Sequence, residues 1–198
     1  MVLPMDTLFG LLFMTMGPIR AVAVFGAVGS DDKAPGVQRL ALHAALITAV
    51  AFIFATIGGT STLAGWRVSL PVVIGSTGVV LLALSLQSLL KPATAMPAAL
   101  DPLMLRPTTI VFPGLFPPIA VTIPIIFAAA YPDQRAQLQI IAIGLGIILV
   151  NWLLMRRAKA VLRVIGSGPF EILGAVFGAL QTALAIQLIV NAVKLLWP

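Results

Sequence analysis

Long apolar runs constrain this chain more than any other feature. Six stretches are each close to the roughly 20 apolar residues that a helix needs to cross a bilayer. Their apolar residues lie on all sides of a helix rather than alternating as in a barrel strand. The six are Leu3–Val28, Leu40–Leu63, Val68–Leu90, Thr108–Ala130, Leu138–Met155 and Ile172–Trp197. Only 9% of the residues are charged, whereas a soluble domain carries about a quarter. The sequence therefore predicts an all-α membrane protein with six transmembrane helices in a single domain, residues 1–198.

A proline-rich segment divides the chain into two halves of three spans each. The first half is residues 1–91, the segment is the linker 92–106, and the second half is residues 107–198. Short cytoplasmic loops are enriched in Lys and Arg. The connections 1–2, 3–4 and 5–6, the last of which reads RRAKAVLRVIGSGPFE, hold eight such residues against three on the other side. We therefore expect these connections to be cytoplasmic and both termini to be extracytoplasmic.

Proline steps at a common offset indicate that the halves are related. The Pro-Ile step at Pro18 recurs at Pro118, 100 residues later, and Gly78 recurs as Gly178 at the same offset. Because each half has an odd number of spans, the second half must enter the membrane from the opposite side. The sequence therefore predicts two inverted three-helix repeats, the construction of many secondary transporters.

The proline steps break the first and fourth spans. Proline has no N–H, so Pro18 leaves the carbonyl of Met14 without its helical partner. Such backbone persists in a bilayer only inside protein or beside a water-filled cavity, and the half-helix after each break presents N–H groups that attract an anion. Two ordinary proline kinks are the simpler alternative. The predicted substrate site comprises Gly17, Pro18, Ile19, Arg20, Pro113, Gly114, Pro117, Pro118, Ile119 and Gln181.

Several polar or small residues have two competing explanations. Arg20 either clamps a substrate carboxylate or extends to the membrane interface. His43, the only histidine, either couples a proton or is a structural residue. Gln181 either lines a substrate path or hydrogen-bonds a neighbouring helix. The Gly174-x-x-x-Gly178 spacing fits a homo-oligomer contact as well as internal helix packing.

Enzyme motifs are missing from the sequence. It contains no H-E-x-x-H, no G-x-S-x-G, no P-loop and no cysteine, so zinc-protease, serine-hydrolase, nucleotide-phosphate and thiolate chemistry lack their usual residues. We therefore expect no enzyme activity, no cofactor and no metal. The expected partners are the lipid bilayer and a small-molecule substrate, without nucleic acid.

Four stretches carry a resemblance to a known family, and one of them, VIGSTGVVLLALSLQSL (73–89), fits its glycine-rich third helix. GPIRAVAVF (17–25) is similar to the family's broken first span, PGLFPPI (113–119) to its fourth span, and GSGPFEILGAVFGALQTALAIQLIVNAV (166–193) to its sixth. The family is MarC, a group of six-span bacterial inner-membrane proteins that includes SnatA-type exporters of small neutral amino acids. Two positions depart from its pattern: Gly17 replaces an acidic or amide residue, and Pro117-Pro118-Ile119 replaces Gly-Pro-Gly.

The resemblance implies export of a small neutral solute, such as an amino acid, by alternating access in a bacterial inner membrane. A passive channel and a non-transporting scaffold or assembly protein are the alternatives. A water-filled cavity that reaches both breaks would favour transport. Breaks plugged by Phe112, Phe116 and their apolar neighbours would favour the scaffold.

Overall fold

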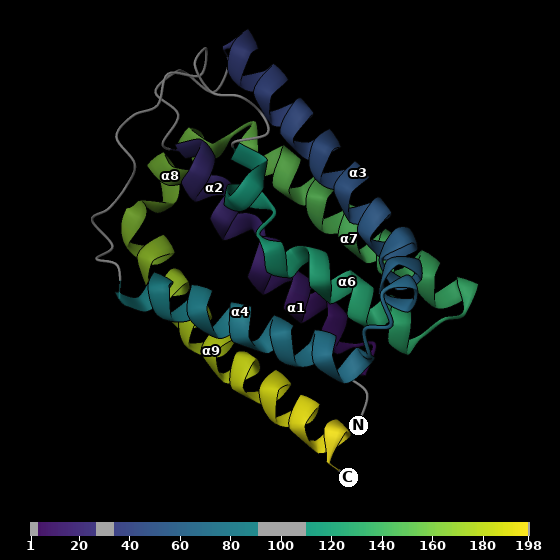
Figure 1. The fold of residues 1–198 in the computed structure, drawn as a ribbon. Helices are drawn as coiled ribbons and strands as arrows, with labels where there is room; N and C mark the ends of the chain where they lie inside the picture. Colours follow the sequence, from purple (N-terminus) through teal and green to yellow (C-terminus); the bar gives the residue numbers. More distant parts are fainter. Residues whose placement is uncertain (1–3, 27–33, 91–109, 198) are drawn as a thin grey trace.

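The computed structural model describes residues 4–26, 34–90 and 110–197, and the regular structure in these ranges is entirely helical (Figure 1). The elements are α1 (Thr7–Met16), α2 (Pro18–Gly26), α3 (Pro35–Gly65), α4 (Leu70–Leu90), the π-helix η1 (Ile110–Leu115), α6 (Pro118–Ala130), α7 (Gln134–Met155), α8 (Ala158–Ile165) and α9 (Ser167–Leu196). The all-α prediction is confirmed for these ranges.

Five of the six predicted spans are long and apolar enough to cross a membrane. They are α1 with α2, then α3, α4, α7 and α9. The fourth predicted span is divided between η1 and α6, and α6 alone has 13 residues. Its shortness follows from the break that precedes it, because Pro118 starts a new helix within what would otherwise be one span.

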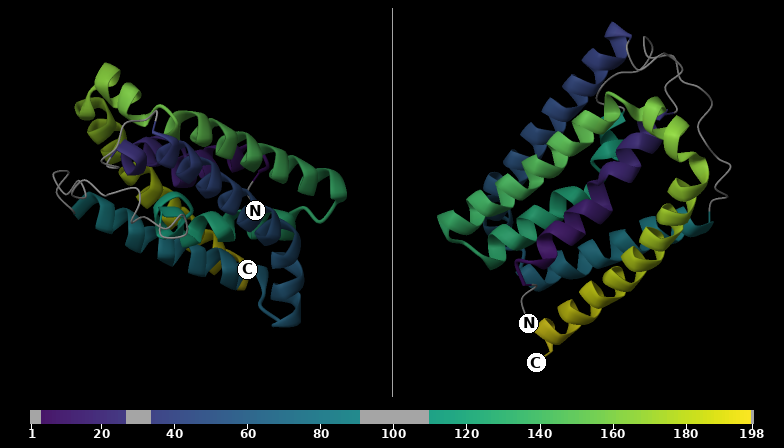
Figure 2. Two further views of the ribbon diagram at one scale, coloured as in Figure 1. Left: turned by 90° about the horizontal axis from the view of Figure 1, so that it is seen from above. Right: turned by 180° about the vertical axis from the view of Figure 1, so that it is seen from behind.

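The two broken spans lie in the middle of the bundle (Figures 1 and 2). On one side of them α3 pairs with α7, and on the other side α4 pairs with α9. Between these pairs, α1 packs against α6 and α2 packs against η1. Most of the buried apolar core is therefore built around the breaks.

The pair formed by α4 and α9 is held by small residues. A Cβ added at Gly78 would lie 2.9–3.0 Å from α9 backbone atoms, and one at Gly75 would lie 3.1 Å from the Cβ of Ala192. Glycine therefore permits the close approach of the two helices, as is common in membranes. Farther along, the hydroxyl of Thr182 donates to the Oγ of Ser85 at 3.0 Å. These contacts run in opposite order along the two helices, so the pair is antiparallel.

The expected connection between the fifth and sixth spans is helical over much of its length. It includes α8 and the first turn of α9, which begins at Ser167. The part of α9 that is apolar enough to cross a membrane begins at Ile172, as predicted. The apolar residues Ala158, Val161, Leu162 and Ile165 follow the i, i+3, i+4, i+7 helical pattern. The helix packs against α2, so its apolar side has a partner. The start of α1 and the end of α9 lie at the same end of the bundle (Figures 1 and 2).

Candidate functional site

The first break occurs at Gly17, which separates α1 from α2. Its backbone is extended, with φ −79° and ψ −178°. An added Cβ would overlap the carbonyl oxygen of Phe13, so this geometry has no room for a side chain. The carbonyl of Gly17 accepts hydrogen bonds from the N–H groups of Arg20 at 3.2 Å and Ala21 at 3.4 Å. The predicted break at Gly17-Pro18 is confirmed, and α2 starts anew after it.

Two amide side chains from the second half of the chain satisfy carbonyls at this break. Nε2 of Gln181 donates to the carbonyl of Met14 at 2.6 Å, the carbonyl that Pro18 deprives of its helical partner. Nδ2 of Asn151 donates to the carbonyl of Met16 at 2.5 Å. Gln181 is 9% exposed and Asn151 is 3% exposed. The structure thus shows Gln181 bonded to a neighbouring helix, the second explanation given above, and adds Asn151, which is not among the predicted site residues.

The second break lies between η1 and α6. Within η1, Phe112 has an extended backbone with φ −112° and ψ 120°. The N–H of Phe116 donates to the carbonyl five residues earlier at 2.8 Å, the spacing of a π-turn. Pro117, whose backbone is extended, then caps α6. The predicted site residues Pro113 and Gly114 lie inside η1. The break predicted over 113–118 is therefore confirmed as a π-turn followed by a cap.

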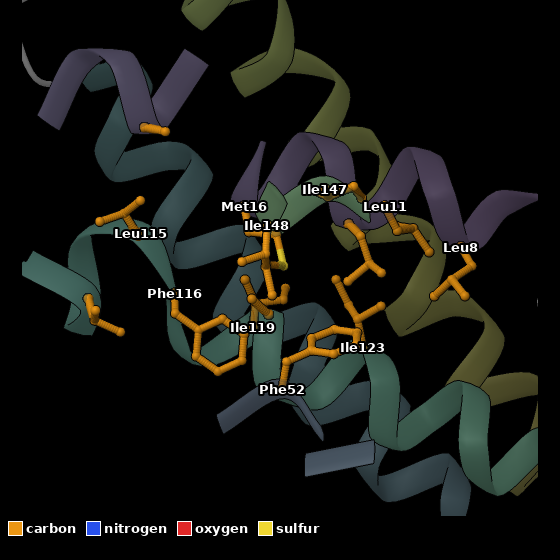
Figure 3. Packing of buried hydrophobic residues seen from close by; sticks show 14 of the residues in the cluster. Leu8, Leu11, Met16, Phe52, Leu115, Phe116, Ile119, Ile123, Ile147 and Ile148 are labelled. Atoms are coloured by element: carbon orange, nitrogen blue, oxygen red, sulfur yellow. The ribbon is translucent and has the colours of Figure 1, made fainter. Parts of the chain in front are cut away.

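The two breaks face each other across a space filled by apolar side chains. Figure 3 shows Met16 and Ile148 directed toward Phe116 and Ile119. All four side chains are buried, and Phe116 is 0% exposed. Phe112 packs edge-on against Phe116 with ring centroids 5.5 Å apart. The predicted residues of the two breaks are brought together, but their meeting point is closed in this conformation.

A cavity of about 310 Å³ reaches the first break but not the fourth span. Its lining is apolar and comes from α1, α2 and α7. The lining residues are Phe9, Phe13, Pro18, Ala142, Ile143, Gly146, Ile147 and Val150. This cavity is therefore not the water-filled connection between both breaks that a conducting state would need.

The two predicted ionisable residues occupy different surroundings. Arg20 is half-buried in the first turn of α2, and its guanidinium has no hydrogen bond or ion pair within the described residues. His43 is exposed on α3, where its Nδ1 donates to the carbonyl of Arg39 at 2.7 Å. The structure places Arg20 beside the first break and does not bring His43 to it. Among the described residues, no group of His, Asp or Glu could hold a metal ion.

Comparison with known protein families gives a match over nearly the whole chain. A family model described as "MarC family integral membrane protein" matches residues 5–197, a range that includes every helix described above. No curated protein and no solved structure matches the chain.

Proposed function

The chain belongs to the MarC family of integral membrane proteins, and from this premise we propose that it is a secondary transporter that exports small neutral solutes, such as amino acids, from a bacterial cell. The observation that carries the proposal is the meeting of two broken spans at the centre of the bundle. Discontinuous helices of this kind bind substrates and coupling ions in many transporters.

The helix pairing supports an inverted repeat. The first span packs against the fourth as α1 with α6, the second against the fifth as α3 with α7, and the third against the sixth as α4 with α9. A pseudo-two-fold axis in the membrane plane would produce this pairing of equivalent spans. In this proposal one repeat rocks against the other and exposes the breaks to each side in turn.

The first break offers complementary ends to a zwitterion. The N-terminus of α2 carries a partial positive charge that suits a carboxylate, and the C-terminus of α1 carries a partial negative charge that suits an ammonium. Arg20, without an ionic partner among the described residues, would assist the carboxylate. The ammonium would take the place of the amide donors from Gln181 and Asn151 on the carbonyls of α1. Neutral amino acids carry both groups, which is why we favour them.

Phe116 supports a second candidate function, a non-transporting scaffold. Its ring is completely buried between the breaks, which is the plugged arrangement that favours a scaffold. In the transport proposal this conformation is an occluded state, and Phe116 must move before substrate enters. In the scaffold proposal it stays in place.

Reconstituted protein distinguishes the carrier from its alternatives. Proteoliposomes would be screened for uptake of small neutral amino acids with and without a proton gradient. Saturable uptake that is stimulated by the same unlabelled amino acid on the opposite side is expected of a carrier. Flux that stays linear in solute concentration would indicate a channel. If no amino acid moved or raised the melting temperature, the transport proposal would fail.

Thiol labelling tests whether the breaks open. The chain has no cysteine, so Met16→Cys introduces a single reactive group at the meeting point of the breaks. Alternating access predicts labelling by an impermeant thiol reagent from either side of the membrane and protection by substrate. Leu12→Cys, an equally buried position one turn earlier in α1, is the matched control and should remain unlabelled. A reporter fused after Pro198 tests the proposed orientation and should read as extracytoplasmic.

A further inference from the structure

The cavity beside Pro18 opens toward lipid rather than toward water. Phe9 is 54% exposed and Val150 is 45% exposed, and both belong to spans that are long and apolar enough to cross a membrane. A Cβ at Gly146 would meet nothing within 4 Å, so this glycine leaves the wall of the cavity open. We call this cavity the α1–α7 groove. Water is scarce in the hydrocarbon layer, and apolar cavities stay dry and accept apolar ligands, so the occupant of the groove must be hydrocarbon.

The groove runs from the outer turns of α1 to the first break, and the end that Pro18 and Val150 form is directed toward the C-terminal end of α7. Its α7 residues Ala142, Gly146 and Val150 run from the middle of the 22-residue helix toward that end. At a helical rise of about 1.5 Å per residue, Gly146 lies about 16 Å from Arg157. That distance is close to half of a hydrocarbon layer of about 30 Å. An acyl chain in the groove would therefore place its headgroup near Arg157.

Two arginines beyond this end of the groove have no protein partner among the described residues. Arg157 and Arg163 are exposed, and neither side chain makes a hydrogen bond or ion pair within that part of the chain. Arg156 differs, because its Nε donates to Oε1 of Gln38 at 2.6 Å. Next to Arg163, Val164 is 86% exposed. A short helix that exposes both basic and apolar side chains is typical of the membrane interface.

We infer that the α1–α7 groove binds one acyl chain of an anionic phospholipid, whose phosphate lies against Arg157 and Arg163. The groove supplies a dry apolar surface of the right depth, and the arginines supply the charge and the N–H donors that phosphate prefers. This inference does not depend on transport. It rests on the surface of the folded chain and applies equally to a scaffold.

The bound lipid would act on the half-helix α2. Pro18, the first residue of α2, lines the groove. At the other end of α2, a Cβ on Gly26 would overlap the side chain of Leu162 in α8, so α2 and α8 are in close contact. The acyl chain would thus contact the first residue of α2, and the headgroup would contact α8, which packs against the other end of α2. Occupancy of the site would favour the position of α2 that the structure shows.

Lipid retention tests the inference directly. The purified full-length chain would be incubated with equal amounts of phosphatidylglycerol and phosphatidylcholine, and retained lipid would be measured by native mass spectrometry. The wild type should retain one phosphatidylglycerol. Gly146→Leu, which fills the groove, should lose it. Gly174→Leu is the matched control, because a Cβ there also meets nothing within 4 Å but lies on α9; it should retain the lipid.

The headgroup is tested separately. Arg157→Gln should lower the ratio of phosphatidylglycerol to phosphatidylcholine about fivefold, as expected for one basic residue at a membrane surface. Arg135→Gln, at the opposite end of α7, should leave the ratio unchanged. If Gly146→Leu does not fold, Ala142→Leu fills the same groove from the adjacent turn.

Three results would overturn the inference. The first is that the wild type retains both lipids equally. The second is that Gly146→Leu retains as much phosphatidylglycerol as Gly174→Leu. The third is that the wild type forms a dimer, which Gly146→Leu abolishes and Gly174→Leu does not. The last result would assign the groove to a second copy of the chain.

Discussion

The hydrogen bond from Gln181 to the carbonyl of Met14 should stabilise the fold more than an ordinary amide contact between membrane helices. Side-chain hydrogen bonds in a membrane protein average about 0.6 kcal/mol, because a released group usually finds another partner. Here Pro18 has removed the natural alternative, the helical N–H, and Gln181 is 9% exposed with a bond of 2.6 Å. Gln181→Leu should therefore cost about 1–3 kcal/mol, the range for a buried group left unpaired.

The measurement is equilibrium unfolding in mixed micelles. Gln187→Leu is the matched control, because it makes the same chemical change in α9. Its side chain is exposed, and it bonds to Asn191 within the same helix at 2.8 Å, so its loss should cost much less. Equal losses for the two variants would contradict the reasoning.

A double-mutant cycle locates the effect at the break. Pro18→Ala restores an N–H that can donate to the carbonyl of Met14, so Gln181→Leu should cost less in that background. We expect a coupling energy of about 1 kcal/mol, within the range for residues that share one network. Strictly additive costs would show that Gln181 does not compensate for the proline.

Three further substitutions probe other features. Gly17→Ala should destabilise the fold, because its Cβ would overlap a carbonyl oxygen one turn earlier; Gly10→Ala, whose Cβ meets nothing within 4 Å, should be neutral or slightly stabilising, and unfolding curves compare the two. Gly78→Val should separate α4 from α9 and lower the melting temperature, whereas Gly174→Val should not; equal melting temperatures would refute the close-packing argument. Phe116→Ala should cost about 3–5 kcal/mol through the cavity it leaves, and a stability equal to the wild type would show that the ring does not fill the space between the breaks.

Local rules of the backbone predicted the two breaks correctly. A proline lacks an N–H wherever it occurs, so Pro18 and Pro118 each predict a break in the helical hydrogen bonds, whatever side chains surround them. The same reasoning identified the carbonyl of Met14 as the group that needs a partner. Gln181 was included in the predicted site, but its bond to that carbonyl could not be predicted, because the two residues are 167 apart along the chain. Only the packing of α9 against the first span brings the two groups together.

The helix α8 was missed, and the sequence left the closed state of the site open as one of two alternatives. The pattern that forms α8 was present at Ala158, Val161, Leu162 and Ile165, but the basic residues around it resemble an ordinary cytoplasmic loop. The closed state of the site is different. It depends on where the rings of Phe112 and Phe116 come to rest, and no spacing along the sequence determines that.

The long-range hydrogen bonds have a consequence for the order in which the protein is made. The carbonyls at the first break receive their hydrogen bonds from Asn151, 135 residues later in the chain, and from Gln181, 167 residues later. Ser85 in α4 likewise receives its bond from Thr182, 97 residues later. While the ribosome is still producing the second half, the inserted first half must keep these polar groups in temporary contact with water, headgroups or the insertion machinery. The early spans therefore complete their folding only after α9 has entered the membrane, and a nascent chain arrested before α9 should be a preferred target for membrane quality-control proteases.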